Sequence, residues 1–380
     1  MRKQVVAAMC DIASYALKSI PMETIKFVAD RLRDKMVFVR MYTLERLADI
    51  YRVYCLKCSD GSFIDYEFEW IPRKIIMCCY DKDFRPQAIE MVFSESLFPS
   101  DLSVVERVKH WIMMYSELEK FEIKAFEVVL AQKQRLQQEM QSYLLLRQKL
   151  KDDNELNFEK QILSCFKTMS LSFKDPAKAE ESFQKLHQMK DIIIWKALTC
   201  LLDPSRTLIQ AQATYIDMLE RLGDKHPQYE FIKTLASKCS YRLFGKEHVK
   251  ELLKEIAVNK LAGKDELIQS GMNLLVLFAG LFPCLVEGSE EELLQLLKED
   301  NECIKEGVVH ILAKVGGSIG EQVTDTTSSV DLLLETLCLE GNRKQAKYVV
   351  QALAVVTKDA GLKALSVLYK VRDCLTSFGG

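Results

Sequence analysis

The chain has 380 residues, of which 48% are apolar and 28% are charged, and its formal net charge is −2. This apolar share suffices for a continuous core and excludes a wholly disordered chain. The balanced charge argues against a dedicated nucleic-acid-binding domain, which normally carries a basic excess. Glycine (15) and proline (8) are scarce, and because both disfavour helix interiors, their scarcity favours helix over sheet. No apolar run reaches the roughly 20 residues of a membrane span.

Apolar residues recur at intervals of three and four along the chain, from residues 37–55 to residues 304–315 and 346–353. Each such stripe covers one face of a helix. Prolines and capping sequences separate the stripes, and Ser103 with Glu106 and Ser289 with Glu292 have the spacing of a capping box. Short helices cannot bury their apolar faces alone, so the sequence predicts an all-α fold, a HEAT/armadillo-type α-solenoid of antiparallel helix pairs. A globular helical bundle is the competing interpretation.

Three segments are typical of the second helix of a HEAT repeat, in which Asp ends the turn and a basic residue follows: residues 34–40, 81–85 and 300–305. Residues 121–152 contain neither Gly nor Pro, and this predicts one long helix. The segment has too many glutamines for the sustained apolar heptads of a coiled coil. We therefore divide the chain into helix pairs over 1–118, a long basic-faced helix over 119–153, and further helix pairs over 154–380. The basic residues expected on the exposed face of the long helix are Lys133, Arg135, Arg147, Lys149 and Lys151.

Residue patterns that carry chemistry are missing. Cys55 and Cys58 form a C-x-x-C, but structural zinc needs four converging ligands, and the adjacent Cys78 and Cys79 would point to different helix faces. Buried, reduced thiols are the simpler interpretation. The glycine-rich residues 316–320 lack the P-loop lysine. The sequence therefore predicts a protein that is not an enzyme, with no catalytic, cofactor-binding or metal residues.

Several blocks spread in order over nearly the whole chain resemble the "precocious dissociation of sisters" family of cohesin-associated proteins, in plant-like detail. These blocks are Ile20–Asp34 with Arg46–Tyr51, Cys79–Arg85, Leu97–Pro99 with Val105–Trp111, Gln132–Met140 and Cys338–Tyr348.

The resemblance implies a HEAT-repeat scaffold of the nucleus that binds the kleisin subunit of cohesin. It implies a role in maintaining and releasing sister chromatid cohesion through the cell cycle, and in associated DNA repair. Further implied partners are a Wapl-type releasing factor, held through regions absent here, and chromatin, reached indirectly. Some members hold inositol hexakisphosphate. Relatives carry more repeats on both sides, so we expect a fragment, an incomplete gene model or a shortened paralogue. The alternative is an adaptor or transport-type α-solenoid that binds other protein partners.

A kleisin segment would need a basic rim and an aromatic anchor, a composition common at binding hot spots. Residues of this kind within the family blocks are Asp81, Lys82, Asp83, Arg85, Arg107, Lys109, His110 and Trp111. A structural role is the competing interpretation for each. In that interpretation the two aspartates cap a turn, Arg85 pairs with them, and Trp111 lies in the core.

Overall fold

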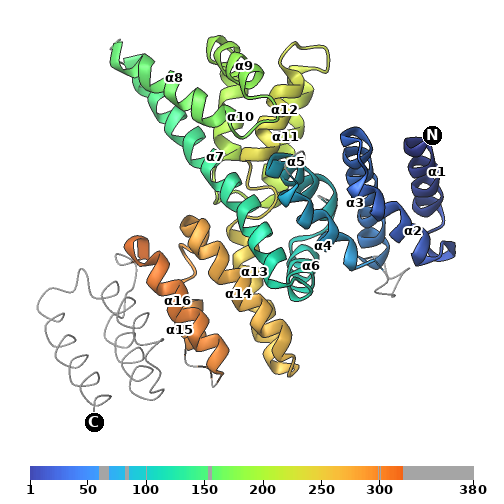
Figure 1. Cartoon of the computed structure of the whole chain (residues 1–380). Coiled ribbons are helices and arrows are strands. Elements are labelled where there is room, and N and C mark those ends of the chain that lie inside the picture. Colours follow the sequence, from blue (N-terminus) through green and yellow to red (C-terminus); the bar gives the residue numbers. More distant parts are fainter. Residues whose placement is uncertain are drawn as a thin grey trace, which may run out of the picture. The chain divides into compact units, whose positions relative to one another are not determined.

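The computed structural model describes residues 1–59, 68–81, 85–99, 101–152, 156–297, 299 and 301–319. Within these residues all regular structure is helical and no strand occurs (Figure 1), which confirms the predicted all-α, HEAT-type fold class. Contacts divide the chain into two compact units. The first holds residues 1–110 and 117–245, and the second holds residues 111–116 and the chain from 246 onward. The predicted division at residues 118 and 153 stays a prediction.

The first unit begins with helices joined by short turns. α1 packs against α3, α3 packs against α4, and single 3₁₀ or π turns finish several of the helices. The helices of this part are α1 (Arg2–Tyr15), α2 (Met22–Ala29), α3 (Val37–Ser59), α4 (Trp70–Met77), α5 (Arg85–Val92) and α6 (Val104–Ser116).

The helix α7 (Lys120–Asp152) occupies the segment for which the sequence predicted one long helix. Along its length it contacts α4, α5, α12 and α8, so it holds the first unit together. The remaining helices of this unit are α8 (Leu156–Ser170), α9 (Pro176–Gln188), α10 (Ile192–Leu201), α11 (Leu208–Leu222) and α12 (Tyr229–Cys239). Their apolar faces share one core with the second half of α7, in which Tyr143, Phe166 and Phe183 are buried.

The predicted basic face of α7 is wrong for two of its residues. Lys133 is only 1% exposed, and its ammonium donates to the carbonyl of Lys238 and lies 4.0 Å from Glu90. Lys133 falls on the same three-and-four spacing as the buried apolar residues of the helix, which turns it inward. The Arg147 guanidinium is half-buried, 3.8 Å from the ring centroid of Trp195. Arg135 and Lys149 are exposed as expected, and the side chain of Lys151 lies outside the described residues.

Capping sequences set several helix starts. The amide of Ser103 donates to Glu106 Oε2 (2.8 Å), and the amide of Glu106 donates to Ser103 Oγ (3.3 Å), so this predicted capping box is confirmed. The box predicted at Ser289 is wrong, because its buried hydroxyl has no hydrogen-bond partner among the described residues. A capping box that the prediction missed joins Thr207 and Gln210 at the start of α11.

The second unit contains α13 (Lys246–Leu261), α14 (Asp265–Leu281), α15 (Glu290–Leu297) and α16 (Glu302–Ile319). α14 and α16 approach closely where Gly307 faces Met272, since a Cβ at Gly307 would overlap the end of that side chain. Trp111, from the second half of α6, is buried in this unit with its ring edge-on to Phe278 at 5.8 Å between centroids.

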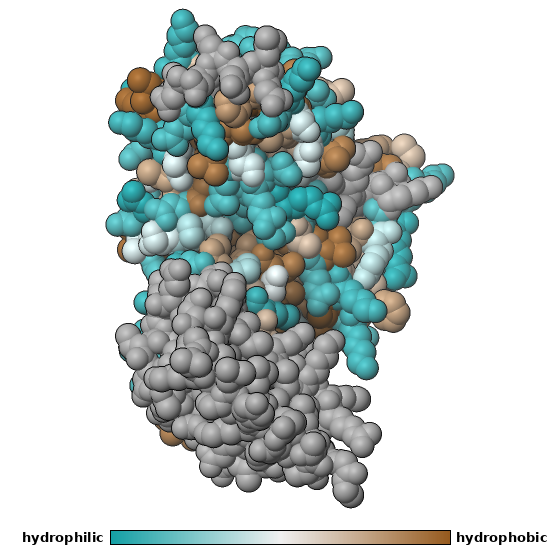
Figure 2. All heavy atoms as spheres, turned by 90° about the vertical axis from the view of Figure 1, so that its left-hand side faces the viewer, coloured by the Kyte–Doolittle hydropathy of each residue, from teal (hydrophilic) through white to brown (hydrophobic). Residues whose placement is uncertain are grey.

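Among the coloured residues of the face seen in Figure 2, hydrophilic side chains are the more common, with groups of apolar side chains among them. Scattered apolar residues of this kind are normal on a protein surface. No helix in the described part of the chain combines the length and apolar character needed to cross a membrane.

Candidate protein-binding groove

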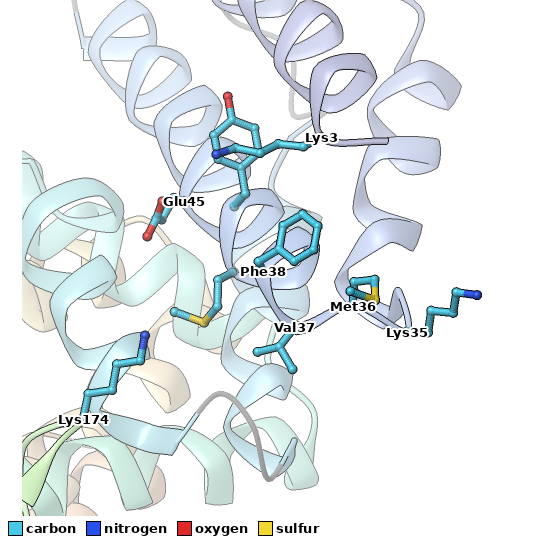
Figure 3. A pocket seen from close by; sticks show the side chains of 9 residues that line it. Lys3, Lys35, Met36, Val37, Phe38, Glu45 and Lys174 are labelled. Carbon is cyan, nitrogen blue, oxygen red and sulfur yellow. The ribbon is translucent and has the colours of Figure 1, made fainter. Parts of the chain in front are cut away.

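An open groove lies where the start of α3 meets the start of α1. Its cavity volume is about 610 Å³. We call it the α3 groove, and its lining residues are Lys3, Lys35, Met36, Val37, Phe38, Met41, Tyr42, Glu45 and Lys174 (Figure 3).

The floor of the α3 groove is apolar and accessible. Met36 is 44% exposed, Val37 42% and Phe38 57%. Large side chains at successive positions of a helix start cannot all turn to one buried face, because neighbouring residues are about 100° apart around the axis. Here Val39 is buried in the core. The three apolar residues before it stay exposed and form a surface that an apolar side chain of a partner can cover.

Lysines from three separate segments surround this floor. Lys3 comes from α1, Lys35 from the turn before α3, and Lys174 from the loop between α8 and α9. Figure 3 shows them on different sides of Phe38 and Val37. The Lys3 ammonium lies 4.5 Å from the centroid of the Tyr42 ring, a cation–π contact that holds the charge beside the groove.

A buried aspartate fixes the turn that presents the groove. Asp34 accepts the amide of Met36 (3.0 Å) and the guanidinium of Arg2 (3.0 and 3.1 Å). The backbone hydrogen bond from Met36 is the main reason that the pKa of Asp34 is lowered, and Arg2 adds to it. The turn, α1 and α3 are therefore locked together at the edge of the groove.

Two of the predicted HEAT turns are joined by an arginine. Arg40 donates to the carbonyl of Asp34 (2.7 Å) and lies 3.2 Å from the carboxylate of Asp81 in the next turn. Arg40 itself is only 8% exposed. The turn aspartate and the following basic residue thus connect consecutive helix pairs, which explains the pattern that the sequence showed.

The first four residues predicted for partner contact lie at this second turn. Asp81 is half-buried and paired with Arg40. Lys82 and Asp83 lie outside the described residues. Arg85 begins α5, but its side chain is not among those described. Partner contact at these positions stays a prediction.

Two of the four residues predicted on α6 are interior. Arg107 and Trp111 are each 1% exposed, so neither offers a rim or an anchor to a partner in this structure. The Arg107 guanidinium donates to the carbonyls of Phe98 (2.6 Å), Pro99 (3.2 Å) and Arg242 (2.6 Å), and burial lowers its pKa to about 10. The guanidinium therefore connects the segment before α6 with the segment after α12. Of the other two, Lys109 is exposed and His110 is half-buried.

His110 belongs to a cluster of polar side chains inside the first unit. Its Nε2 lies 3.1 Å from the carbonyl of Leu97 and 3.3 Å from the hydroxyl of Tyr51. Tyr51 and Tyr54 both donate to the carboxylate of Glu69, at 3.3 and 2.9 Å. Burial lowers the pKa of His110 to about 4 and raises those of the tyrosines and of Glu69. Every group of the cluster is thereby shifted toward its neutral form.

A second buried cluster connects three helices of the same unit. The Lys238 ammonium on α12 donates to Glu90 on α5 (2.7 Å), and Lys133 on α7 lies on the other side of that carboxylate. All three residues are 3% exposed or less. Burial lowers the pKa of Lys133 to about 8, against the attraction of Glu90. The cluster therefore holds α5, α7 and α12 together through buried side chains.

The α3 groove does not suit inositol hexakisphosphate, which the family resemblance left open. A compact polyanion needs cations that converge on it from all sides. Here an apolar floor separates the lysines, and Glu45 adds a negative charge to the lining. In the described residues no group of three or more His, Cys, Asp or Glu side chains is placed to hold a metal ion.

The sequence prediction missed the groove although a signal was present. The segment from residue 34 to 40 was interpreted as the turn and second helix of a HEAT repeat, and its run of Met, Val and Phe was not considered as a surface. Three large apolar residues in succession exceed what one helix face can bury. The apolar residues that one helix face cannot bury, next to Lys35, were the signal in the sequence that indicated a binding surface.

Comparison with known proteins gives a consistent result over nearly the whole chain. The family model "Sister chromatid cohesion protein PDS5 protein" matches residues 1–376. The chain is 53% identical over 370 residues to sister chromatid cohesion protein PDS5 homolog A of Arabidopsis thaliana, which covers 97% of this chain and 23% of that protein. It is 24% identical over 374 residues to PDS5 homolog B of Homo sapiens, covering 94% of this chain and 26% of that protein.

The chain thus spans about a quarter of the length of these curated relatives. A match over residues 1–376 extends through both compact units and includes the α3 groove. The chain belongs to the sister chromatid cohesion protein PDS5 family.

Proposed function

We propose that this chain is a non-catalytic scaffold that binds the kleisin subunit of cohesin through the α3 groove and so regulates sister chromatid cohesion in the nucleus. The family match over residues 1–376 is the observation that carries the proposal. The names of the relatives refer to cohesion, and this favours cohesin over the adaptor or transport partners of the alternative interpretation. Maintenance and release of cohesion and a part in DNA repair are included in the proposal.

The groove supports a scaffold role because it offers what a peptide-binding surface needs. Its floor contains three exposed apolar side chains, and its edge carries cations from three segments. An apolar centre with a polar rim is the usual anatomy of a protein interface. Its floor lies on α3, whose start is held by Asp34, so a bound segment would meet a surface that is already ordered.

The polar clusters support the absence of catalysis. A general base works best with a pKa near the operating pH, whereas burial lowers the pKa of His110 to about 4. Its ring nitrogen is engaged by the carbonyl of Leu97 and by Tyr51. The chemistry of this cluster suits a structural role.

The test is capture of the chain by the immobilised kleisin of Arabidopsis thaliana. We expect wild-type chain to be retained and Phe38→Glu to be lost, because a carboxylate would be forced into the apolar floor. Phe27→Glu is the matched control, since Phe27 on α2 is similarly exposed (65% against 57%) and does not line the groove. Circular dichroism of both variants checks that they are folded.

Two results would count against the proposal in different ways. Failure of the kleisin to retain the wild-type chain would refute the function. Equal retention of Phe38→Glu and Phe27→Glu would leave kleisin binding standing but would remove it from the α3 groove.

A further inference from the structure

We infer that two copies of this chain pair through helix α1, which lies antiparallel against α1 of the second copy. The inference stands apart from the α3 groove and from the proposed function. It depends on an exposed apolar stripe along α1, on the symmetry of that stripe about Ala8, and on the polar residues beside it.

An apolar stripe along the outer face of α1 stays exposed among the described residues. Val5 is 52% exposed, Ile12 58% and Tyr15 91%, and Ala8 between them is exposed as well. Met1, at the N-cap of the helix, is 99% exposed. We call these five residues the α1 stripe.

The opposite side of α1 already faces the core. Val6, Cys10 and Ala13 are buried there, and the helix packs against α2 and α3. Figure 1 shows α1 at one end of the first unit, with those two helices beside it. A helix that is apolar on both sides is typical of one that is enclosed by neighbours. A neighbour is therefore expected on the side of the α1 stripe.

The spacing of the α1 stripe indicates that this neighbour is a helix. Its members follow one another in alternating steps of four and three residues. Such steps form the seam along which two helices pack with their axes nearly aligned. A strand presents every second residue on one face and would not match this seam.

The charged residues of α1 are already engaged within the first unit. Arg2, Lys3 and Asp11 each have a partner there. Asp11, for example, is paired with Arg46 of α3. The helix therefore offers no uncommitted charge of its own to a phosphate group or an oppositely charged peptide. What the stripe offers is apolar contact, which suits the apolar face of another helix.

The α1 stripe is nearly symmetric about Ala8, and this makes it complementary to itself. A two-fold axis at Ala8 brings Met1 of one copy against Tyr15 of the other, and Val5 near Ile12. Contacts in which residue i meets j and j meets i define an isologous dimer. Because Ala8 has a small side chain, the helices can approach closely where they cross, while the larger side chains pack at both ends.

Polar residues beside the stripe favour the antiparallel direction. Gln4 and Asp11 are seven residues apart, so they lie on the same flank of the helix. Gln4 is exposed, and the side chain of Asp11 is 69% exposed. In the antiparallel pair Gln4 faces Asp11 of the second copy, and its amide can donate to that carboxylate, twice by symmetry. A parallel pair would place the two Asp11 carboxylates side by side, where like charges repel.

A second stripe with the same spacing occurs on α11 and is shorter. Ile209 is 81% exposed and Ile216 43%, with the exposed Ala213 between them. The next position of that stripe is Glu220, which ends its apolar part. A contact between α1 and α11 would join different surfaces of two copies and would produce open chains instead of a closed dimer. Pairing of α1 with itself covers the longer stripe in one symmetric contact.

The first test is sedimentation velocity of the 380-residue chain. The concentrations range from about 1 to about 200 µM, because an interface of this small size gives a weak dimer. We expect a monomer–dimer equilibrium with a dissociation constant on the order of tens of micromolar. Ile12→Glu should raise this constant at least about ten-fold, because each dimer would bury two carboxylates among apolar side chains.

Ile209→Glu is the matched control. It introduces the same charge at an exposed isoleucine on another helix, and we expect it to change the dissociation constant by less than about two-fold. Both isoleucines are exposed, at 58% and 81%, so neither change enters the core. Circular dichroism of the two variants checks that they are folded.

The second test is disulfide cross-linking, which reports the direction of the pair. Packed helix axes are about 8–10 Å apart and each Cα lies about 2.3 Å from its axis, so facing Cα atoms at residue 8 are about 3.4–5.4 Å apart. Ala8→Cys should therefore form a cross-linked dimer under mild oxidation. In the antiparallel pair the two copies of residue 5 are about 9 Å apart along the axes, too far for a disulfide. Val5→Cys should then cross-link no more than wild type, which controls for the native cysteines.

Four results would overturn the inference. The first is a chain that stays monomeric at every concentration, and the second is a dimer that Ile12→Glu leaves unchanged. The third is association that Ile12→Glu and Ile209→Glu weaken equally, which would assign the contact to α1 with α11. The fourth is equal cross-linking of Ala8→Cys and Val5→Cys, which would indicate a parallel pair. Retention on kleisin is a separate readout, because no residue of the α1 stripe lines the α3 groove.

Discussion

The buried guanidinium of Arg107 holds the segments on either side of α6 through three backbone carbonyls. Replacement by methionine keeps most of the side-chain volume but removes every donor. Three backbone carbonyls, those of Phe98, Pro99 and Arg242, then lose a charged partner. Since the acceptor on Arg242 is 135 residues away in the chain, the change affects the packing of distant segments together.

The expected loss of stability can be worked from these contacts. A hydrogen bond to a charged group contributes about 1.5–3 kcal/mol, and Arg107 makes three. Burial of the cation costs about 3 kcal/mol, the equivalent of lowering its pKa from 12.5 to about 10. Methionine avoids that cost. The three bonds together contribute about 4.5–9 kcal/mol, so the difference is a loss of about 1.5–6 kcal/mol in the free energy of unfolding.

Urea unfolding followed by far-ultraviolet circular dichroism measures this loss. Lys109→Met is the matched control, because Lys109 lies on the same helix and is exposed. We expect the control to stay within about 0.5 kcal/mol of wild type. If Arg107→Met unfolded at the same urea concentration as the control, the three carbonyl contacts would contribute nothing net, and the reasoning would be refuted.

Three further changes test other parts of the structure. Gly307→Ile should lower the free energy of unfolding by about 1–3 kcal/mol, because its branched side chain meets Met272 not only at the flexible end but also near the Cβ, which lies 3.3 Å from the Cβ position of residue 307 and cannot swing away. An unchanged thermal midpoint would contradict the close α14–α16 contact. Glu90→Gln leaves two buried lysines without their carboxylate and should cost about 3–5 kcal/mol in urea unfolding, so a variant as stable as wild type would show that these lysines are neutral or hydrated. His110 has a lowered pKa in the folded chain, about 4 against 6.5, so the unfolded chain binds an extra proton between these values. Stability is expected to fall by up to about 3 kcal/mol as the pH drops from 6.5 to 4, and His110→Gln should remove that slope in denaturant titrations at successive pH values.

The helices could be predicted from the sequence because each depends mainly on nearby residues. The three-and-four spacing of apolar residues, the capping box at Ser103 and the absence of Gly and Pro from residues 121–152 are local features. They fix helix content, and the burial of one face per helix then requires stacking. The failed box at Ser289 shows the limit of this reasoning, because the spacing of the two residues does not reveal that the hydroxyl is buried without a hydrogen-bond partner among the described residues.

Arg107 and Lys133 were expected at the surface as charged side chains, and the structure places both in the interior. Arg107 is interior since carbonyls from a distant segment converge on it, and no local pattern shows that convergence. Lys133 is a different case. It continues the buried stripe of α7 through Val129, Leu136 and Met140, so the spacing indicated an inward position, while residue type suggested the opposite. Residue spacing was the better guide.

The length of α7 has a mechanical consequence. A helix of 33 residues extends about 50 Å, and within it each carbonyl except those of the last turn accepts an amide one turn further on. Near the start of α7 the hydroxyl of Tyr80 donates a hydrogen bond to the carbonyl of Phe121 (2.9 Å). Near its end the guanidinium of Arg147 packs on the ring of Trp195. Tension applied to one of these contacts would be transmitted along a stiff rod instead of being absorbed at flexible joints. The segments attached to α7 at these two contacts are therefore expected to move together under load.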